Sequence, residues 1–322
     1  MIDPSNEFAI GIDIGGTNTK YGIVNHRGEI LGKGELKTDD FPKIESYVDA
    51  LYDVVNLLIK KHADGGGVKG IGIGAPNGNF YTGTIEYAPN LQWKGIIPLT
   101  KLVTAKFGLP SALTNDANAA AVGEMNYGVA RGMRDFIMIT LGTGVGSGIV
   151  ANGQLILGHD GFAGELGHTI IRPGGRKHWS TELDGSLEAY CSATGIAITA
   201  KEMLEKTKED SLLRKYNDKI DSKIVYECAA KGDTIAQEVY NFTGQILGEA
   251  LANFIMFSSP EAIVLFGGVI KAGDLIMKPT KEHMEKNLLP IFQNKVKLIF
   301  SELKEADAAI LGASALVWEI RE

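Results

Sequence analysis

FAIGIDIGGTNTKYGIVNHRGEILG at residues 8–32 and DFIMITLGTGVGSGIVANGQLILG at residues 135–158 are two versions of one pattern. In each, an apolar strand leads into a glycine-rich polar turn, which is followed by a second strand, a tight turn and a third strand. The first two strands leave no room for a helix between them, so they are expected to pair antiparallel. A pattern that occurs twice in one chain indicates an internal duplication.

The rest of the chain mixes helices with further strands. Apolar residues spaced three and four positions apart predict a helix over residues 42–64, and a strand is predicted at residues 68–74. Beyond about residue 190 the pattern is mostly helical, with its longest helix at residues 233–257. A strand at residues 262–266 and a last helix at residues 307–319 complete the prediction.

The composition is that of a globular, acidic protein. With 322 residues, of which 44% are hydrophobic, the chain is long enough for two domains, and no low-complexity linker separates them. We therefore expect the domains to pack across a cleft. The formal net charge of −7 disfavours a nucleic-acid partner, which requires a basic surface.

The low cysteine content and the lack of a targeting signal predict a cytoplasmic location. Cys191 and Cys228 are too few for a disulfide framework. The first seven residues lack a signal-peptide pattern, and no apolar run approaches the roughly 18 residues of a membrane span. We expect no membrane partner.

The first glycine-rich turn, from Asp13 to Lys20, suits a phosphate. Adjacent glycines let the backbone approach a phosphate closely, and threonine and asparagine side chains add hydrogen-bond donors. An aspartate at the end of the preceding strand can hold Mg²⁺, directly or through water. A plain hairpin turn with an incidental aspartate explains the same residues equally well.

The second turn, from Gly142 to Gly148, nearly matches the dinucleotide-binding pattern G-x-G-x-x-G, and Asp160 lies at about the right distance for a ribose contact. A dinucleotide loop must open a helix, however, whereas Ile149, Val150 and an Asn-Gly hairpin turn follow here. The sequence contains no P-loop motif. Two phosphate-type hairpin turns, one from each domain, fit a single triphosphate held between them.

Asn115 and Asp116 come at the end of a strand and run into an alanine-rich helix. Aspartate is a favoured N-cap and stabilises a helix start by about 1 kcal/mol. A carboxylate at a cleft can also accept a proton from a substrate hydroxyl. The pattern by itself slightly favours the cap.

Glu165, His168 and Glu188 form a third group of polar residues. Carboxylates beside glycines suit paired hydrogen bonds to neighbouring sugar hydroxyls, and surface salt bridges with a structural histidine are the alternative. The remaining histidines show no partner pattern and are interpreted as surface or core residues: His26, His62, His159, His178 and His283.

Taken together, these motifs resemble the ROK family of sugar kinases (repressor, open reading frame, kinase), within the sugar kinase/actin/Hsp70 superfamily. The resemblance covers nearly the whole chain and rests on elements in the family's order. The elements are the phosphate motifs 13–17 and 140–146, the E-x-G-H element 165–168, the adenosine motif 264–268, the closing helix 307–313 and the sugar-side segments 88–93 and 115–118.

This resemblance implies an α/β fold of the actin-like ATPase (duplicated ribonuclease H-like) class, with two domains around a cleft and a five-stranded mixed sheet in each. The first domain would comprise residues 1–115 plus 305–322, and the second residues 116–304. The implied reaction is ATP-dependent phosphorylation of the 6-hydroxyl of an aldohexose. Glucose is the first choice, and N-acetylglucosamine or mannose the next. A catalytically silent sugar-binding protein and a polyphosphate-dependent glucokinase are the alternatives, and a homodimer or homotetramer is expected.

The resemblance also assigns roles to residues. Asp116 would be the catalytic base, kept ionised by the helix that it begins. The hexose-binding residues would be Asn90, Asn115, Asp116, Glu165, His168 and Glu188. Asp13 would hold Mg²⁺ through water and, with the loops, bind ATP. The other ATP-binding residues would be Gly15, Gly16, Thr17, Asn18, Thr143, Gly144, Gly267 and Gly268.

The sequence departs from the family at its zinc site, which usually combines the histidine of E-x-G-H with three cysteines. Here the cysteine positions hold Trp179, Thr181 and Ser186, and zinc requires about four nitrogen or sulfur ligands. Cys191 and His178 would not rebuild the site. We therefore predict no structural zinc, with the loop after His168 held by packing that involves Trp179.

Some members of the family are repressors that carry a DNA-binding segment before the first phosphate motif. Only twelve residues precede Asp13 here, and the net charge is negative. We therefore expect a kinase without a nucleic-acid partner.

Overall fold

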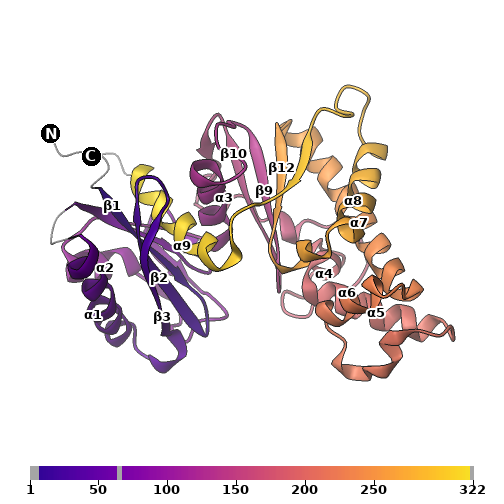
Figure 1. Cartoon of the computed structure of the whole chain (residues 1–322), viewed down its shortest axis with the longest axis horizontal. Coiled ribbons are helices and arrows are strands. Elements are labelled where there is room, and N and C mark those ends of the chain that lie inside the picture. The colour runs from indigo at the N-terminus through magenta and orange to yellow at the C-terminus, as the bar shows by residue number, and fades with distance from the viewer. Residues whose placement is uncertain (1–6, 64–66, 320–322) are drawn as a thin grey trace. The chain divides into compact units, whose positions relative to one another are not determined.

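The computed structural model describes residues 7–63 and 67–319 (Figure 1). These residues form two compact units, of which the first takes residues up to 134, residues 148–164 and those from 301 on. The second unit takes residues 135–147 and 165–300. The domain boundaries predicted from the sequence stay a prediction. Within the described ranges, every helix is too short or too polar to cross a membrane.

The first sheet is built around the first copy of the duplicated pattern. Strands β1 and β2 pair antiparallel, as do β2 and β3, whereas β1, β4 and β8 run parallel to one another. The strand order is β3-β2-β1-β4-β8. The bounds are β1 Phe8–Ile14, β2 Asn18–Asn25, β3 Ile30–Lys37, β4 Val68–Gly74 and β8 Ser111–Thr114.

The second sheet repeats this plan with the second copy. Its order is β11-β10-β9-β12-β13, in which β9, β12 and β13 run parallel and β10 pairs antiparallel with β11. Two five-stranded mixed sheets with matching strand orders confirm the predicted duplication. The bounds are β9 Phe136–Leu141, β10 Val145–Ala151, β11 Gln154–Leu155, β12 Ala262–Phe266 and β13 Lys297–Phe300.

Helix α1, Ile44–His62, and helix α9, Glu305–Ala315, pack on the first sheet (Figure 1). The predicted apolar face of α1 is buried in the core that also holds the isoleucines of β1 and β4. Helix α9 lies so close to β1 that a Cβ at Gly11 would be 2.1 Å from the carbonyl oxygen of Ile310. Only glycine fits at this point of the strand.

The remaining helices are α2 Leu99–Phe107, α3 Asp116–Tyr127, α4 Glu188–Cys191, α5 Ala193–Lys206, α6 Ser222–Ala230, α7 Thr234–Ser258 and α8 Asp274–Lys286. The predicted long helix is confirmed as α7, which lies one residue further along the chain. The predicted last helix ends earlier, at Ala315, and continues as a 3₁₀ turn over Leu316–Glu319. A small sheet of β5 Gly78–Asn79, β6 Thr84–Glu86 and β7 Ile96–Ile97 was not predicted.

Candidate active site

The predicted site residues fall into two groups, one in each compact unit. The first unit holds Asp13, Gly15, Gly16, Thr17, Asn18, Asn90, Asn115 and Asp116. The second unit holds Thr143, Gly144, Glu165, His168, Glu188, Gly267 and Gly268.

Two carboxylates meet at one edge of the first sheet. Asp13 is the last residue but one of β1, and Asp116 begins α3 directly after β8. Because β1, β4 and β8 are parallel, their carboxyl ends share this edge. A Cβ at Gly74, the last residue of β4, would lie 3.8 Å from both Asp13 Oδ1 and Asp116 Cα. Gly74 thus lies between the two aspartates, and a Cβ there would also lie 3.3 Å from Cβ of Ala119.

Burial, together with the negative charge of Asp116, raises the pKa of Asp13 to about 6, against the opposing effect of the Lys20 charge. Burial also raises the pKa of Asp116, although the backbone N–H groups of Ala117 and of Asp116 itself lower it. The helix start therefore lowers the pKa of Asp116, as expected, but desolvation raises it by more. Asp116 as a residue nevertheless keeps surface in contact with solvent, so a substrate can reach it.

The N-cap of α3 is Asn115 rather than Asp116. The Oδ1 atom of Asn115 accepts a hydrogen bond of 2.7 Å from the backbone N–H of Asn118. Asp116 is the first helical residue, and its Oδ1 accepts from the N–H of Ala117 at 2.9 Å. The interpretation of Asp116 as a cap is wrong by one residue, because both residue types favour that position.

The first glycine-rich turn joins β1 to β2 as a tight hairpin. The N–H of Gly15 donates to the carbonyl oxygen of Asn18 at 2.9 Å. A Cβ at Gly16 would lie 2.4 Å from the carbonyl oxygen of Asn90, so this glycine lets the predicted sugar-side segment contact the turn. Thr17 and Asn90 are both exposed. The structure brings these predicted residues together, and their roles stay predictions.

In the second unit, the predicted ATP-binding glycines share one edge of the second sheet. Strands β9 and β12 are parallel neighbours, with Thr140 opposite Phe266. Gly267 has a φ of +103°, and a Cβ there would lie 2.5 Å from the carbonyl oxygen of Leu141. A Cβ at Gly268 would meet nothing within 4 Å. The loop after β9 leads directly into β10, so the helix that a dinucleotide loop requires is absent there.

The E-x-G-H element and Glu188 both contact this loop. A Cβ at Gly167 would lie 2.0 Å from the carbonyl oxygen of Val145, which explains the glycine in the element. The Oε2 atom of Glu188 accepts a hydrogen bond of 2.6 Å from the N–H of Val145. Gly144 permits this approach, because a Cβ there would be 2.4 Å from the same oxygen. Glu165 and His168 make only a loose pair, with His168 Nε2 3.9 Å from Glu165 Oε2.

Sequence reasoning missed one residue in this group, His178. Its side chain is buried, and its Nε2 lies 2.7 Å from Oε1 of Glu188. His178 belongs to an irregular loop ten residues before Glu188, so no helical or strand periodicity connects the two. The one available signal was its position, directly before the first of the lost cysteine positions.

The residues around His168 do not fit a zinc ion. The three cysteine positions supply an exposed indole at Trp179, an exposed hydroxyl at Thr181 and a buried hydroxyl at Ser186, none of which replaces a thiolate. A search of the described ranges finds no cluster of three or more His, Cys, Asp or Glu side chains that could hold a metal. Trp179 is 43% exposed and stacks on His178, with 4.0 Å between the ring centroids. The absence of zinc from the protein stays a prediction.

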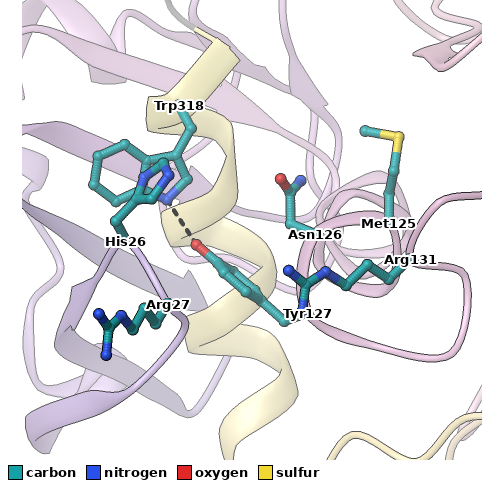
Figure 2. Close-up of a pocket in the computed structure, with 7 residues that line it drawn as sticks. All are labelled: His26, Arg27, Met125, Asn126, Tyr127, Arg131 and Trp318. Atoms are coloured by element: carbon teal, nitrogen blue, oxygen red, sulfur yellow. Dashed lines mark hydrogen bonds between the residues drawn. The ribbon is translucent and has the colours of Figure 1, made fainter. Parts of the chain in front are cut away.

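A cavity of about 610 Å³ in the first unit lies elsewhere (Figure 2). Asp116 begins α3, whereas the cavity lies at the other end of this helix of twelve residues. Its lining contains none of the predicted site residues and consists of His26, Arg27, Met125, Asn126, Tyr127, Arg131 and Trp318.

The sequence matches the ROK family over residues 9–320. The chain belongs to the ROK family. A glucokinase of Halalkalibacterium halodurans is 37% identical to this ROK chain over 320 residues, which are 97% of this chain and 96% of that protein. The crystal structure of a ROK family glucokinase from Streptomyces griseus, in complex with glucose and AMPPNP, is 31% identical. Its TM-score is 0.78, and the match covers 97% of this chain and 100% of that one.

Regulators also occur among the ROK relatives. A xylose repressor of Caldicellulosiruptor bescii is 29% identical over 312 residues, which are 96% of this chain and 77% of the repressor. The solved ROK kinase structures have the actin-like ATPase fold, and this chain shares it. The predicted fold and the predicted family are thus confirmed.

Proposed function

We propose that this ROK protein is an ATP-dependent hexokinase that phosphorylates the 6-hydroxyl of glucose. A hexose kinase follows from the 37% identity to a glucokinase and from the likeness to the glucokinase that binds glucose and AMPPNP. Glucose is the preferred hexose in this proposal, ahead of N-acetylglucosamine and mannose. A cytoplasmic location and a homodimer or homotetramer are part of the same proposal.

The paired carboxylates of Asp13 and Asp116 carry the proposal. Phosphoryl transfer to an alcohol needs a group that accepts the hydroxyl proton as the new bond forms. Asp116 is exposed, fixed at the start of α3, and has a pKa raised toward the working pH of a general base. We assign it this role. Asn90, Asn115, Glu165, His168 and Glu188 are assigned to the remaining hydroxyls of the hexose.

Asp13 is assigned to Mg²⁺, held through water. A half-buried carboxylate whose pKa is raised by desolvation and by a second carboxylate suits a cation, whose positive charge would offset both effects. When bound, Mg²⁺ neutralises charge on the phosphates of ATP. The glycine-rich turns and Gly267–Gly268 are assigned to ATP.

A coupled assay with purified protein and Mg²⁺ tests the proposal against its alternatives. Glucose, N-acetylglucosamine, mannose and fructose are each offered with ATP or with polyphosphate, and glucose binding is measured separately by calorimetry. Glucose with ATP is expected to give the highest kcat/KM. Tight glucose binding without turnover would instead favour the silent sugar-binding protein. The xylose repressor among the relatives is the observation that supports this alternative. If the protein turns over glucose with polyphosphate but not with ATP, the phosphoryl donor is polyphosphate and the proposal of ATP is wrong.

A further inference from the structure

His178 has its Nδ1 atom turned toward its own loop. Nδ1 lies 3.1 Å from the backbone N of Thr181, 3.3 Å from that of Ser180 and 3.0 Å from the Thr181 hydroxyl. A backbone N–H can only donate, so Nδ1 is the accepting nitrogen of the ring. The hydrogen-bond pattern therefore assigns the ring proton of neutral His178 to Nε2.

Nε2 in turn faces Glu188, at 2.7 Å from Oε1. Nε2 is buried, and Glu188 Oε1 is the polar atom that it approaches, although the two atoms do not have hydrogen-bond geometry. The other carboxylate oxygen of Glu188 accepts from the N–H of Val145. The Glu188 carboxylate is thus hydrogen-bonded at one oxygen and closely approached by His178 at the other, and each oxygen keeps a lone pair for a ligand hydroxyl.

The loop that carries His178 is fixed independently of Glu188. The side chain of Arg176 donates to the carbonyl oxygens of Ala189 and Gly195 and to both carboxylate oxygens of Glu202. One backbone bridge joins Lys177 to Asp184 on either side of the turn, and a second joins Ile170 to Ser186. His178 itself is only 2% exposed. Its imidazole is therefore presented to Glu188 from a rigid support.

We propose that His178 is a positioning residue that holds the Glu188 carboxylate in place for the hexose. His178 lies in the loop where the family resemblance implies a zinc ion, which the residues at positions 179, 181 and 186 do not fit. The inference rests on the proposed function, because Glu188 is assigned to the hexose there. It predicts that the contact matters for hexose binding rather than for ATP binding. The loop after β9, which is assigned to ATP, keeps its other hydrogen bonds without Glu188. These run from Gly142 N–H to Gly144 O and from Ala193 N–H to Gly142 O.

Two conservative variants separate the two ring nitrogens. In His178→Asn, the amide oxygen replaces Nδ1 as the acceptor of the loop N–H groups, but nothing reaches Glu188. In His178→Gln, the longer side chain places an N–H donor close to the position of Nε2. Lys177→Ala is the matched control, because Lys177 lies in the same loop and its exposed side chain pairs with Glu182 at 3.3 Å rather than with Glu188. Steady-state kinetics, glucose calorimetry and thermal unfolding are measured for each protein.

His178→Asn is expected to raise the KM and the Kd for glucose by about 10-fold, the size of one lost interaction with a charged group. In His178→Asn the KM for ATP should change less than about 3-fold. His178→Gln should recover most of the glucose affinity that His178→Asn loses. Lys177→Ala should behave as the wild type.

Four outcomes would overturn the inference. In the first, folded His178→Asn binds glucose as the wild type does. In the second, the KM values for glucose and ATP rise equally in both variants, which indicates a purely structural role. In the third, neither His178→Asn nor the volume-matched His178→Met folds, which indicates the same. In the fourth, the wild type neither binds nor phosphorylates glucose, and that result overturns the proposed function as well. An active wild type with unaffected variants overturns this inference alone.

Discussion

Asp13 illustrates, at the scale of a single residue, how a functional site opposes stability. Its carboxyl has a pKa of about 6 in the folded protein, against 3.8 for an exposed aspartate, because burial and the charge of Asp116 disfavour ionisation. The folded state therefore holds this proton more tightly than the unfolded state does. The free energy of unfolding falls as the pH rises from about 4 to about 6, and it stays lowered above that range.

Asp13→Asn should remove this pH dependence. At pH 8 and without Mg²⁺, we expect the variant to be more stable than the wild type by up to about 3 kcal/mol, since one pKa unit corresponds to about 1.4 kcal/mol. Near pH 3.5 the two proteins should be equally stable. The variant should also lack kinase activity when assayed with Mg²⁺ at neutral pH. Urea unfolding at both pH values measures the difference, with the exposed Asp40→Asn as control. A stability difference that does not change with pH would contradict the account.

At the scale of elements, the crossing of α3 and α9 fixes the helix that begins with Asp116. A Cβ at Gly312 in α9 would lie 2.5 Å from the carbonyl oxygen of Ala119 in α3. A Cβ at Gly123 in α3 would lie 2.9 Å from Cα of Gly312. The two helices approach this closely because each has a glycine at the crossing.

Gly312→Ala should therefore force the helices apart and lower the free energy of unfolding by about 1–3 kcal/mol, the usual cost of overpacking. Gly268→Ala makes the same chemical change where a Cβ meets nothing within 4 Å, so its stability should match that of the wild type. Thermal and urea unfolding of the two variants test this comparison. Equal stabilities would mean that the helix crossing is not tightly packed.

The elements that were predicted from the sequence are those with strong local patterns. The apolar strand Phe8–Ile14 and the periodic face of α1 need no tertiary information, and both were predicted within two residues at each end. The small sheet of β5, β6 and β7 was missed, because strands of two or three residues carry no readable alternation. The cap at Asn115 was placed one residue late, since neighbouring asparagine and aspartate give the same signal.

The candidate site was predictable to the extent that it lies in motifs. The motif residues of each unit lie together at one sheet edge or against one loop, as Asp13 and Asp116 do across Gly74. His178 was not predictable in this way. Its contact with Glu188 depends on the path of a loop that is set by backbone bridges and by Arg176, and neither leaves a period in the sequence.

At the scale of the whole molecule, we predict that the loop after His168 is held by side chains rather than by zinc. Metal analysis of the purified protein should find no stoichiometric zinc, because the cysteine positions supply no thiolates. A chelator should reduce activity only by removing Mg²⁺, and added Mg²⁺ should restore it fully. One zinc ion bound per chain would mean that a different set of ligands surrounds His168.

The kcat of Asp116→Asn decides whether Asp116 is the general base. Asn115 caps α3, and an asparagine at position 116 keeps an oxygen that can accept from the N–H of Ala117, so the variant should fold and bind glucose normally. If Asp116 accepts the proton of the 6-hydroxyl, kcat should fall by on the order of 10²–10⁴-fold, the usual contribution of a general base. Circular dichroism and glucose calorimetry establish that the variant is folded and binds its substrate. A kcat close to that of the wild type in such a protein would contradict the assignment of Asp116 as the base.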